Sequence, residues 1–114
     1  MPKLSYLDAI NQAMDQAMEK DNNVFVIGED VGLKGGVFGA TKNLYNKYGE
    51  GRVIDSPLAE SNIVGASIGA AMMGKRPVSE IQFAEYIVPA TNQIINEAAK
   101  IRYRSNNDWD CPLT

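Results

Sequence analysis

The chain has 114 residues, a length that suits one domain with a modest core. Its 14 acidic residues outnumber the 11 Lys and Arg, and no apolar run is long enough to cross a bilayer, so we expect neither nucleic acid nor a membrane as a partner. Histidine is absent and Cys111 is the only cysteine, so this segment supplies no imidazole base and no four-cysteine metal site. The amino terminus lacks the pattern of a secretory signal, and we expect a cytoplasmic protein.

The first half of the chain alternates helical and extended patterns. Ser5 is a typical N-cap, and apolar residues at spacings of three and four predict a helix from there to about Lys20. The run NVFVIGED is almost continuously apolar, as in a strand that is buried on both faces. The glycine-rich stretch GLKGGVFG then leads to a helix predicted from about Thr41 to Tyr48 and closed by Gly49.

The second half continues the alternation. RVID and PVSEIQF are strand candidates, and a helix of small residues is predicted between them, from about Ala59 to Met73. A further helix is predicted from Pro89 to about Tyr103, and CPLT is expected to open another strand. This order predicts an α/β domain with a mostly parallel sheet flanked by helices. Because the sequence ends on an apolar strand pattern, we expect it to be a fragment of a longer chain.

Two glycine-rich stretches approach nucleotide-binding motifs without matching them. GAAMMGKR has the Gly and Lys spacing of a phosphate loop, but Arg76 stands where Ser or Thr would bind magnesium, and Pro77 follows where a helix should begin. GLKGGVFG follows a strand but lacks the glycine spacing of a dinucleotide fingerprint. We therefore expect neither kind of nucleotide site.

Glu60 is the only charged residue between Asp55 and Lys75, and it follows a proline turn where a strand gives way to a helix. Such a glutamate is either a helix start favoured by the helix dipole or a group that an α/β fold presents to a ligand. In the helix that follows, Gly65 and Gly69 leave one face almost without side chains. That face suits a close contact, which is either internal or between subunits.

The stretch PLAESNIVGASIGAAMM resembles the shared motif of thiamine diphosphate enzymes, with Met73 where Gln is usual. Together with GEDVG, GGVFGAT, RVIDSPLAE, GKRPVSEIQF and NEAAKIRYRS, it makes nearly the whole chain similar to one family. That family is the β subunit of the decarboxylase component of 2-oxo acid dehydrogenases, in its amino-terminal, pyrimidine-binding domain. IQFAEY and IRYRSNNDW look most like the branched-chain (2-oxoisovalerate) type, and pyruvate and acetoin relatives are close.

The resemblance implies a transketolase-like fold for residues 1–114, truncated before the rest of the domain and a carboxyl-terminal domain. It also implies a site for thiamine diphosphate. Glu60 would be the catalytic acid that shares a proton with the pyrimidine ring, Leu58 and Gln82 would contact the ring, and Glu29 would be a second acid near Glu60. Tyr86 would stack on the ring, although the residues alone explain it equally well as a half-buried aromatic at a helix start.

The family's motif for the diphosphate and its Mg²⁺ is absent here and, by the resemblance, belongs to an α subunit. We therefore expect half an active site and no metal ligand on this chain. The implied assembly is α2β2, with a second β subunit and a lipoyl-bearing acyltransferase as further partners. The implied reaction is oxidative decarboxylation of a branched-chain 2-oxo acid with acyl transfer to the lipoyl carrier, and the isolated chain is expected to be inactive.

Two other readings of the sequence stay open. Transketolase or deoxyxylulose phosphate synthase is the nearest enzyme alternative, but a histidine-containing stretch typically follows the glutamate there. Ser61 and Asn62 occupy that stretch here and argue against it. The alternative from another class is an interaction module that keeps the fold without catalysis.

Overall fold

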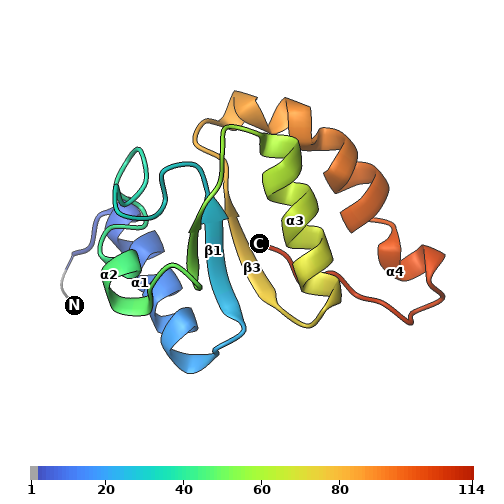
Figure 1. The fold of residues 1–114 in the computed structure, drawn as a ribbon, viewed down its shortest axis with the longest axis horizontal. Helices are drawn as coiled ribbons and strands as arrows, with labels where there is room; N and C mark the ends of the chain where they lie inside the picture. The colour runs from blue at the N-terminus through green and yellow to red at the C-terminus, as the bar shows by residue number, and fades with distance from the viewer. Residues whose placement is uncertain (1–2) are drawn as a thin grey trace.

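The computed structural model describes residues 3–114, and its centre is a three-stranded parallel sheet in the order β2-β1-β3. The strands are β1 (Val24–Gly28), β2 (Val53–Asp55) and β3 (Arg76–Glu80). Gly28 is in register with both Asp55 and Glu80, so the three strands end at the same edge of the sheet. Helices lie on both sides of this sheet (Figure 1), and the predicted α/β class is confirmed.

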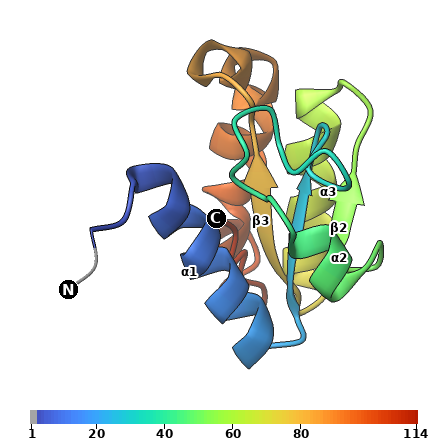
Figure 2. The ribbon, with the colours of Figure 1, turned by 90° about the vertical axis from the view of Figure 1, so that its left-hand side faces the viewer.

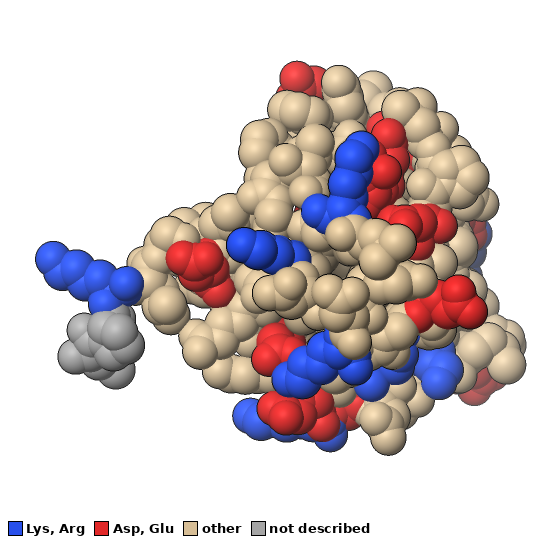
Figure 3. All heavy atoms as spheres, turned by 60° about the vertical axis from the view of Figure 1, so that its left-hand side comes forward, with Lys and Arg blue, Asp and Glu red and all other residues tan. Residues whose placement is uncertain are grey.

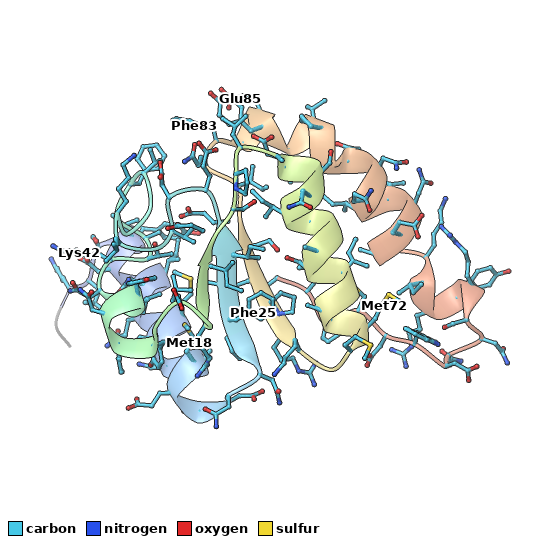
Figure 4. All side chains as sticks on the ribbon, in the orientation of Figure 1. Met18, Phe25, Lys42, Met72, Phe83 and Glu85 are labelled. Carbon is cyan, nitrogen blue, oxygen red and sulfur yellow. The ribbon has the colours of Figure 1, made fainter. Side chains whose placement is uncertain are left out.

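Two helices, α1 (Tyr6–Lys20) and α2 (Leu44–Tyr48), lie on one side of the sheet (Figures 1 and 2). The predicted N-cap is confirmed, because the Ser5 hydroxyl accepts a hydrogen bond from the Asp8 amide at 3.1 Å. Figure 4 shows Met18 of α1 on this side of the sheet. The core here consists of buried apolar side chains from both helices and the sheet: Met14, Met18, Val24, Val26, Val31, Leu44 and Val53.

The small-residue helix α3 (Glu60–Met72) covers the other side of the sheet, close to its predicted bounds. It ends at Gly74, whose φ of 88° is the left-handed conformation that favours glycine after a helix. Ser67 is fully buried and donates to the Ile63 carbonyl at 2.8 Å, while Ser79 of β3 donates to the Ser67 hydroxyl at 2.7 Å. These hydrogen bonds fix α3 against β3 without an unpaired buried hydroxyl.

Two predicted helices differ from the structure. The helix expected from Thr41 begins at Leu44, because Asn43 has a left-handed φ of 67°. The helix expected from Pro89 begins earlier and consists of three short pieces. They are the 3-10 helix η1 (Ala84–Ala90), the π-helix η2 (Gln93–Ala98) and α4 (Ile101–Arg104).

Pro89 therefore lies inside η1 and not in the first turn of a helix. Proline has no amide hydrogen and its ring clashes with the carbonyl four residues earlier, so a regular α-helix does not run through this position. After it, the Ala99 amide donates to the Ile94 carbonyl at 2.9 Å, five residues back, which is the π-helical spacing. The sequence correctly predicted helical structure in this segment, but the prediction of one regular α-helix was wrong.

The strand expected at CPLT is not formed in the described chain, but Thr114 makes one pair of backbone hydrogen bonds with β3. The Thr114 amide donates to the Pro77 carbonyl at 3.1 Å, and the Ser79 amide donates to the Thr114 carbonyl at 2.8 Å. This alternation is that of parallel neighbours, on the edge of β3 that β1 does not occupy. Among the described helices, none is long and apolar enough to cross a membrane.

Candidate functional site at the carboxyl edge of the sheet

The three strands deliver their following segments to one edge of the sheet. Glu29 comes directly after β1, a turn through Ser56 and Pro57 leads from β2 into α3, and Gln82 comes two residues after β3. In open parallel sheets, ligands bind outside the carboxyl ends of the strands. Because the sheet is parallel, Glu29 and Glu60 both follow strand ends at this edge, although their proximity stays a prediction.

Glu60 is the first residue of α3 and is half-buried. Its N-cap neighbour Ala59 provides no side-chain cap, so the negative charge near the helix start contributes about 0.3 to 1 kcal/mol through the helix dipole. Within the described part of the chain, the Glu60 carboxylate has no ion pair and accepts no hydrogen bond. Because Glu60 is partly exposed, water can solvate its carboxylate, and a ligand group could take the place of that water.

The predicted ring contacts are spread around this edge. Gln82 donates from Nε2 to the Glu29 main-chain carbonyl at 3.4 Å, a long bond that links the ends of β3 and β1. Leu58 is 70% exposed and Tyr86 is 41% exposed, so both side chains present apolar surface at the edge. A flat, partly apolar ligand would bury these side chains.

A short hydrogen bond holds the segments of Glu60 and Tyr86 together. The Ser61 hydroxyl in the first turn of α3 donates to the Pro89 carbonyl in η1 at 2.6 Å. Tyr86 belongs to η1, and its amide donates to the Phe83 carbonyl at 2.9 Å. Figure 4 shows Phe83 at the level of the molecule where α3 begins. Glu60 and Tyr86 therefore come from directly joined elements.

Gly65 and Gly69 have different surroundings. A Cβ on Gly65 would make an ordinary contact with the Gln93 side chain at 3.6 Å, whereas a Cβ on Gly69 would meet no atom within 4 Å. A close internal contact therefore does not explain Gly69 in the part of the chain that the structure describes. The role of this helix face between subunits stays a prediction.

Glu80 is a site residue that the sequence reading missed. It ends β3, its Oε2 atom is buried without a hydrogen-bond partner among the described residues, and burial raises the pKa of its carboxyl. The glycine-rich loop covers it, because Oε1 lies 3.2 Å from where a Cβ of Gly36 would stand. The only signal in the sequence was an acidic residue within the strand pattern of PVSEIQF.

A row of aromatic rings was also missed. The rings of Phe38 and Phe83 meet edge to face with centroids 5.3 Å apart, and those of Phe83 and Tyr86 do so at 5.2 Å. Phe38 is in the glycine-rich loop, so the row links that loop to η1. Nothing in the spacing of GGVFG and IQFAEY indicates this contact, because the two stretches meet only in the folded chain.

The chemistry of this edge suits an organic ring better than a metal ion or a polyanion. Residues 3–114 contain no group of three or more His, Cys, Asp or Glu side chains that could hold a metal. Figure 3 shows Lys and Arg interspersed with Asp and Glu, so the visible face has no large area of one sign. An unpartnered carboxylate, an amide and exposed apolar side chains match a flat heterocycle that carries a basic nitrogen.

The fold is that of an α/β domain whose candidate site lies at the carboxyl ends of its parallel strands. The family model described as transketolase, pyrimidine binding domain matches residues 2–114, and the chain belongs to this family. This confirms the family and the transketolase-like fold that the motif around Glu60 indicated.

Curated relatives of the chain have matching names. It is 66% identical to 2-oxoisovalerate dehydrogenase subunit beta of Bacillus subtilis, over 99% of this chain and 35% of the relative. It is 50% identical to the protein of that name from Pseudomonas aeruginosa, over 97% and 32%. It is 49% identical to pyruvate dehydrogenase E1 component subunit beta of Acholeplasma laidlawii, over 99% and 35%. The chain therefore spans about a third of the length of these relatives.

Proposed function

We propose that this chain is the amino-terminal, pyrimidine-binding part of the β subunit of a thiamine diphosphate-dependent 2-oxo acid dehydrogenase of the 2-oxoisovalerate type. The relative at 66% identity supports this type. The observation that carries the proposal is the Glu60 carboxylate, which has no partner among the described residues and begins α3, the helix that the Ser61–Pro89 hydrogen bond joins to η1 with its exposed Tyr86 ring. A free acid and an exposed aromatic ring on two joined elements suit a pyrimidine ring.

Glu60 acts as the catalytic acid in this proposal. Thiamine diphosphate, when bound here, would supply a carbon nucleophile for the oxo group of the substrate. The Glu60 carboxyl holds a proton at one of its oxygens and shares it with a nitrogen of the pyrimidine ring. Positioned proton sharing of this kind contributes about 10² to 10⁴ in rate. The helix dipole at the start of α3 favours the ionised carboxylate when the proton has moved to the ligand.

The neighbouring side chains bind and orient the ring. Tyr86 stacks on it, and Leu58 covers it from the turn before α3, so both exclude water from the Glu60 carboxyl. Gln82 can turn its amide from the long 3.4 Å bond with the Glu29 carbonyl toward the ring. Glu29, whose main-chain carbonyl accepts this bond, acts as a second acid near Glu60.

The remaining functions belong to partners. By the resemblance to the family, an α subunit binds the diphosphate and Mg²⁺. Two such pairs form an α2β2 assembly, and the acyl group passes to a lipoyl-bearing acyltransferase. On this account the 114-residue chain has no activity by itself. The cytoplasmic location stays a prediction, and relatives from Dictyostelium discoideum and Arabidopsis thaliana are named as mitochondrial.

A pyruvate dehydrogenase β subunit is the second candidate, because relatives of that name reach 49% identity. The test is to express the full-length β chain with its α partner and to measure decarboxylation of 2-oxoisovalerate and pyruvate, each with and without thiamine diphosphate. We expect cofactor-dependent turnover with the larger kcat/KM for 2-oxoisovalerate. A preference for pyruvate would select the second candidate, and turnover that does not need the cofactor would contradict both.

A further inference from the structure

The aromatic row described above connects a loop that has no assigned role to the proposed ring-binding residue Tyr86. Its three rings are partly exposed, at 60% for Phe38, 38% for Phe83 and 41% for Tyr86. They come from segments far apart in the sequence and meet at the carboxyl edge of the sheet. The three rings touch one another edge to face and belong to neither buried core cluster, so they form an exposed aromatic surface.

The loop that carries Phe38 is fixed at its base. The Asp55 carboxylate at the end of β2 accepts a hydrogen bond from the Gly32 amide at 2.7 Å, and the buried Thr41 hydroxyl donates to the Val31 carbonyl at 2.7 Å. The side chain of Asn11 in α1 donates to the Ala40 carbonyl at 2.7 Å. Phe38 therefore projects from a loop that is tied to the sheet and to α1 on both sides of its tip.

The ring of Phe83 lies between Phe38 and Tyr86 and contacts both. Edge-to-face pairs place the positive edge of one ring on the negative face of the next, so each ring restricts the rotation of its neighbour. The interplanar angles are 73° between Phe38 and Phe83 and 61° between Phe83 and Tyr86. Without the first ring, Phe83 loses its outer neighbour, and the plane of Tyr86 is less well defined.

We propose that Phe38 and Phe83 are positioning residues, which set the plane of Tyr86 so that a flat heterocycle can stack on it. The glycine-rich loop is thereby part of the ring-binding site, although it does not itself contact the ring. This inference rests on the proposed function of Tyr86. The positioning role of Phe38 and Phe83 is distinct from the stacking role of Tyr86, because Tyr86 could stack on a ligand without the loop.

The test uses the full-length β chain assembled with its α partner and measures the Kd for thiamine diphosphate, and separately kcat at saturating cofactor. Removing one edge-to-face contact should weaken binding about three- to tenfold in Phe38→Ala and Phe83→Leu. Phe38→Tyr keeps the ring and should restore the wild-type Kd. Tyr103→Ala, which removes an aromatic side chain that is 90% exposed on α4, is the matched control and should leave the Kd unchanged.

A double-mutant cycle separates positioning from a general structural effect. If Phe38 acts through Tyr86, Phe38→Ala should weaken binding in the wild type but have no further effect in a Tyr86→Ala background. Equal effects of Phe38→Ala in both backgrounds would overturn the inference, as would an unchanged Kd in the single variant. In either of those cases, a higher Kd in Tyr86→Ala alone would leave the proposed function intact. A wild-type assembly that does not bind thiamine diphosphate would overturn both.

Discussion

The two ends of the sheet differ in how completely their polar groups are satisfied. At the amino-terminal end, the Arg52 guanidinium donates to the main-chain carbonyls of Val24 and Met18, both at 2.8 Å, and of Asp21 at 3.0 Å. At the carboxyl edge, the Glu60 carboxylate and the buried Oε2 of Glu80 have no partner among the described residues. Native proteins rarely leave a buried atom such as Oε2 of Glu80 unpaired without a reason. The first region thus serves folding, and the second is where we propose that the ligand binds.

The helices α1 and α2 extend the satisfied region. Asp15 accepts hydrogen bonds from Lys47 and from the Tyr48 hydroxyl, both at 2.7 Å. These bonds lower the pKa of Asp15, and the bond to Asp15 raises the pKa of Lys47. The Tyr48 ring also lies under the Arg52 guanidinium at 5.2 Å. Every charged group of this cluster is explained by the contacts of the chain itself, which is the pattern expected of a structural surface.

The largest effect should come from Glu60→Gln in the assembled enzyme. Glutamine keeps the size of the side chain but cannot share a proton, so kcat should fall about 10² to 10⁴-fold while thiamine diphosphate still binds. Steady-state kinetics at saturating cofactor measures this. Glu50→Gln makes the same chemical change at an exposed residue between α2 and β2 and should leave kcat unchanged. A Glu60→Gln enzyme with wild-type kcat would show that Glu60 only favours the helix start. The carboxyl edge of the sheet would then have no catalytic role that distinguishes it from the amino-terminal end.

The next largest effect should come from Arg52→Ala, and on stability. Three main-chain carbonyls would lose their donor, which we expect to lower the free energy of unfolding of the full-length chain by about 2 to 3 kcal/mol. Urea denaturation measures this. The matched control is Arg104→Ala, whose exposed ion pair with Glu97 should contribute less than about 1 kcal/mol. Equal effects of the two substitutions would mean that the amino-terminal end is not the better-anchored region.

Smaller effects are expected for Gly69→Ala, which should raise the stability of the β chain and weaken the α2β2 assembly. The added methyl group has open space within the chain, and alanine favours a helix by about 1 kcal/mol over glycine, so the β chain should become more stable. If this face of α3 contacts another subunit closely, the same methyl group should weaken the α2β2 assembly in sedimentation experiments. An assembly as tight as the wild type would remove Gly69 from the subunit interface.

The smallest effect should be a pH dependence from Glu80. Burial raises the pKa of its carboxyl above the ordinary value of 4.5, so the folded state favours the neutral form. The contribution of Glu80 is then fully present below pH 4.5 and is lost as the pH rises through the folded-state pKa. Glu80→Gln stays neutral, and it should therefore gain stability relative to the wild type between pH 4 and pH 8, by an amount that unfolding curves at several pH values measure.

A matched comparison isolates this effect. The exposed Glu50 should show no such change, so the stability difference between Glu50→Gln and the wild type should be the same at both pH values. A Glu80→Gln difference that is equally flat would show that the carboxyl of Glu80 is solvated in the folded chain. The glycine-rich loop would then not cover it.

The sequence was sufficient for features that depend on local patterns. The Ser5 cap, the buried run of β1 and the start of α3, predicted at about Ala59 and found at Glu60, follow from capping, hydrophobicity and the proline turn. The irregular helix after Gln82 could not be foreseen, because Pro89 shifts the hydrogen bonds and the tertiary contact of Ser61 with the Pro89 carbonyl holds the result.

The site was predictable only where a short motif carries it. Glu60 was found because it heads a recognisable motif, and its motif alone did not say whether its carboxylate is paired. Glu80 and Phe38 were missed because their surroundings come from different parts of the chain: Gly36 covers Glu80, and Phe83 meets Phe38. Such contacts depend on the parallel register of the strands, which no local pattern contains.

The central claim is that the carboxyl edge of this sheet binds the pyrimidine ring through Glu60. It is tested most directly by a crystal structure of the full-length β chain with its α partner and thiamine diphosphate. The account predicts a Glu60 carboxylate oxygen about 2.7 Å from a pyrimidine nitrogen, with the ring stacked on Tyr86. A cofactor bound away from this edge, or a Glu60 carboxylate paired with another protein group while the cofactor is present, would contradict it.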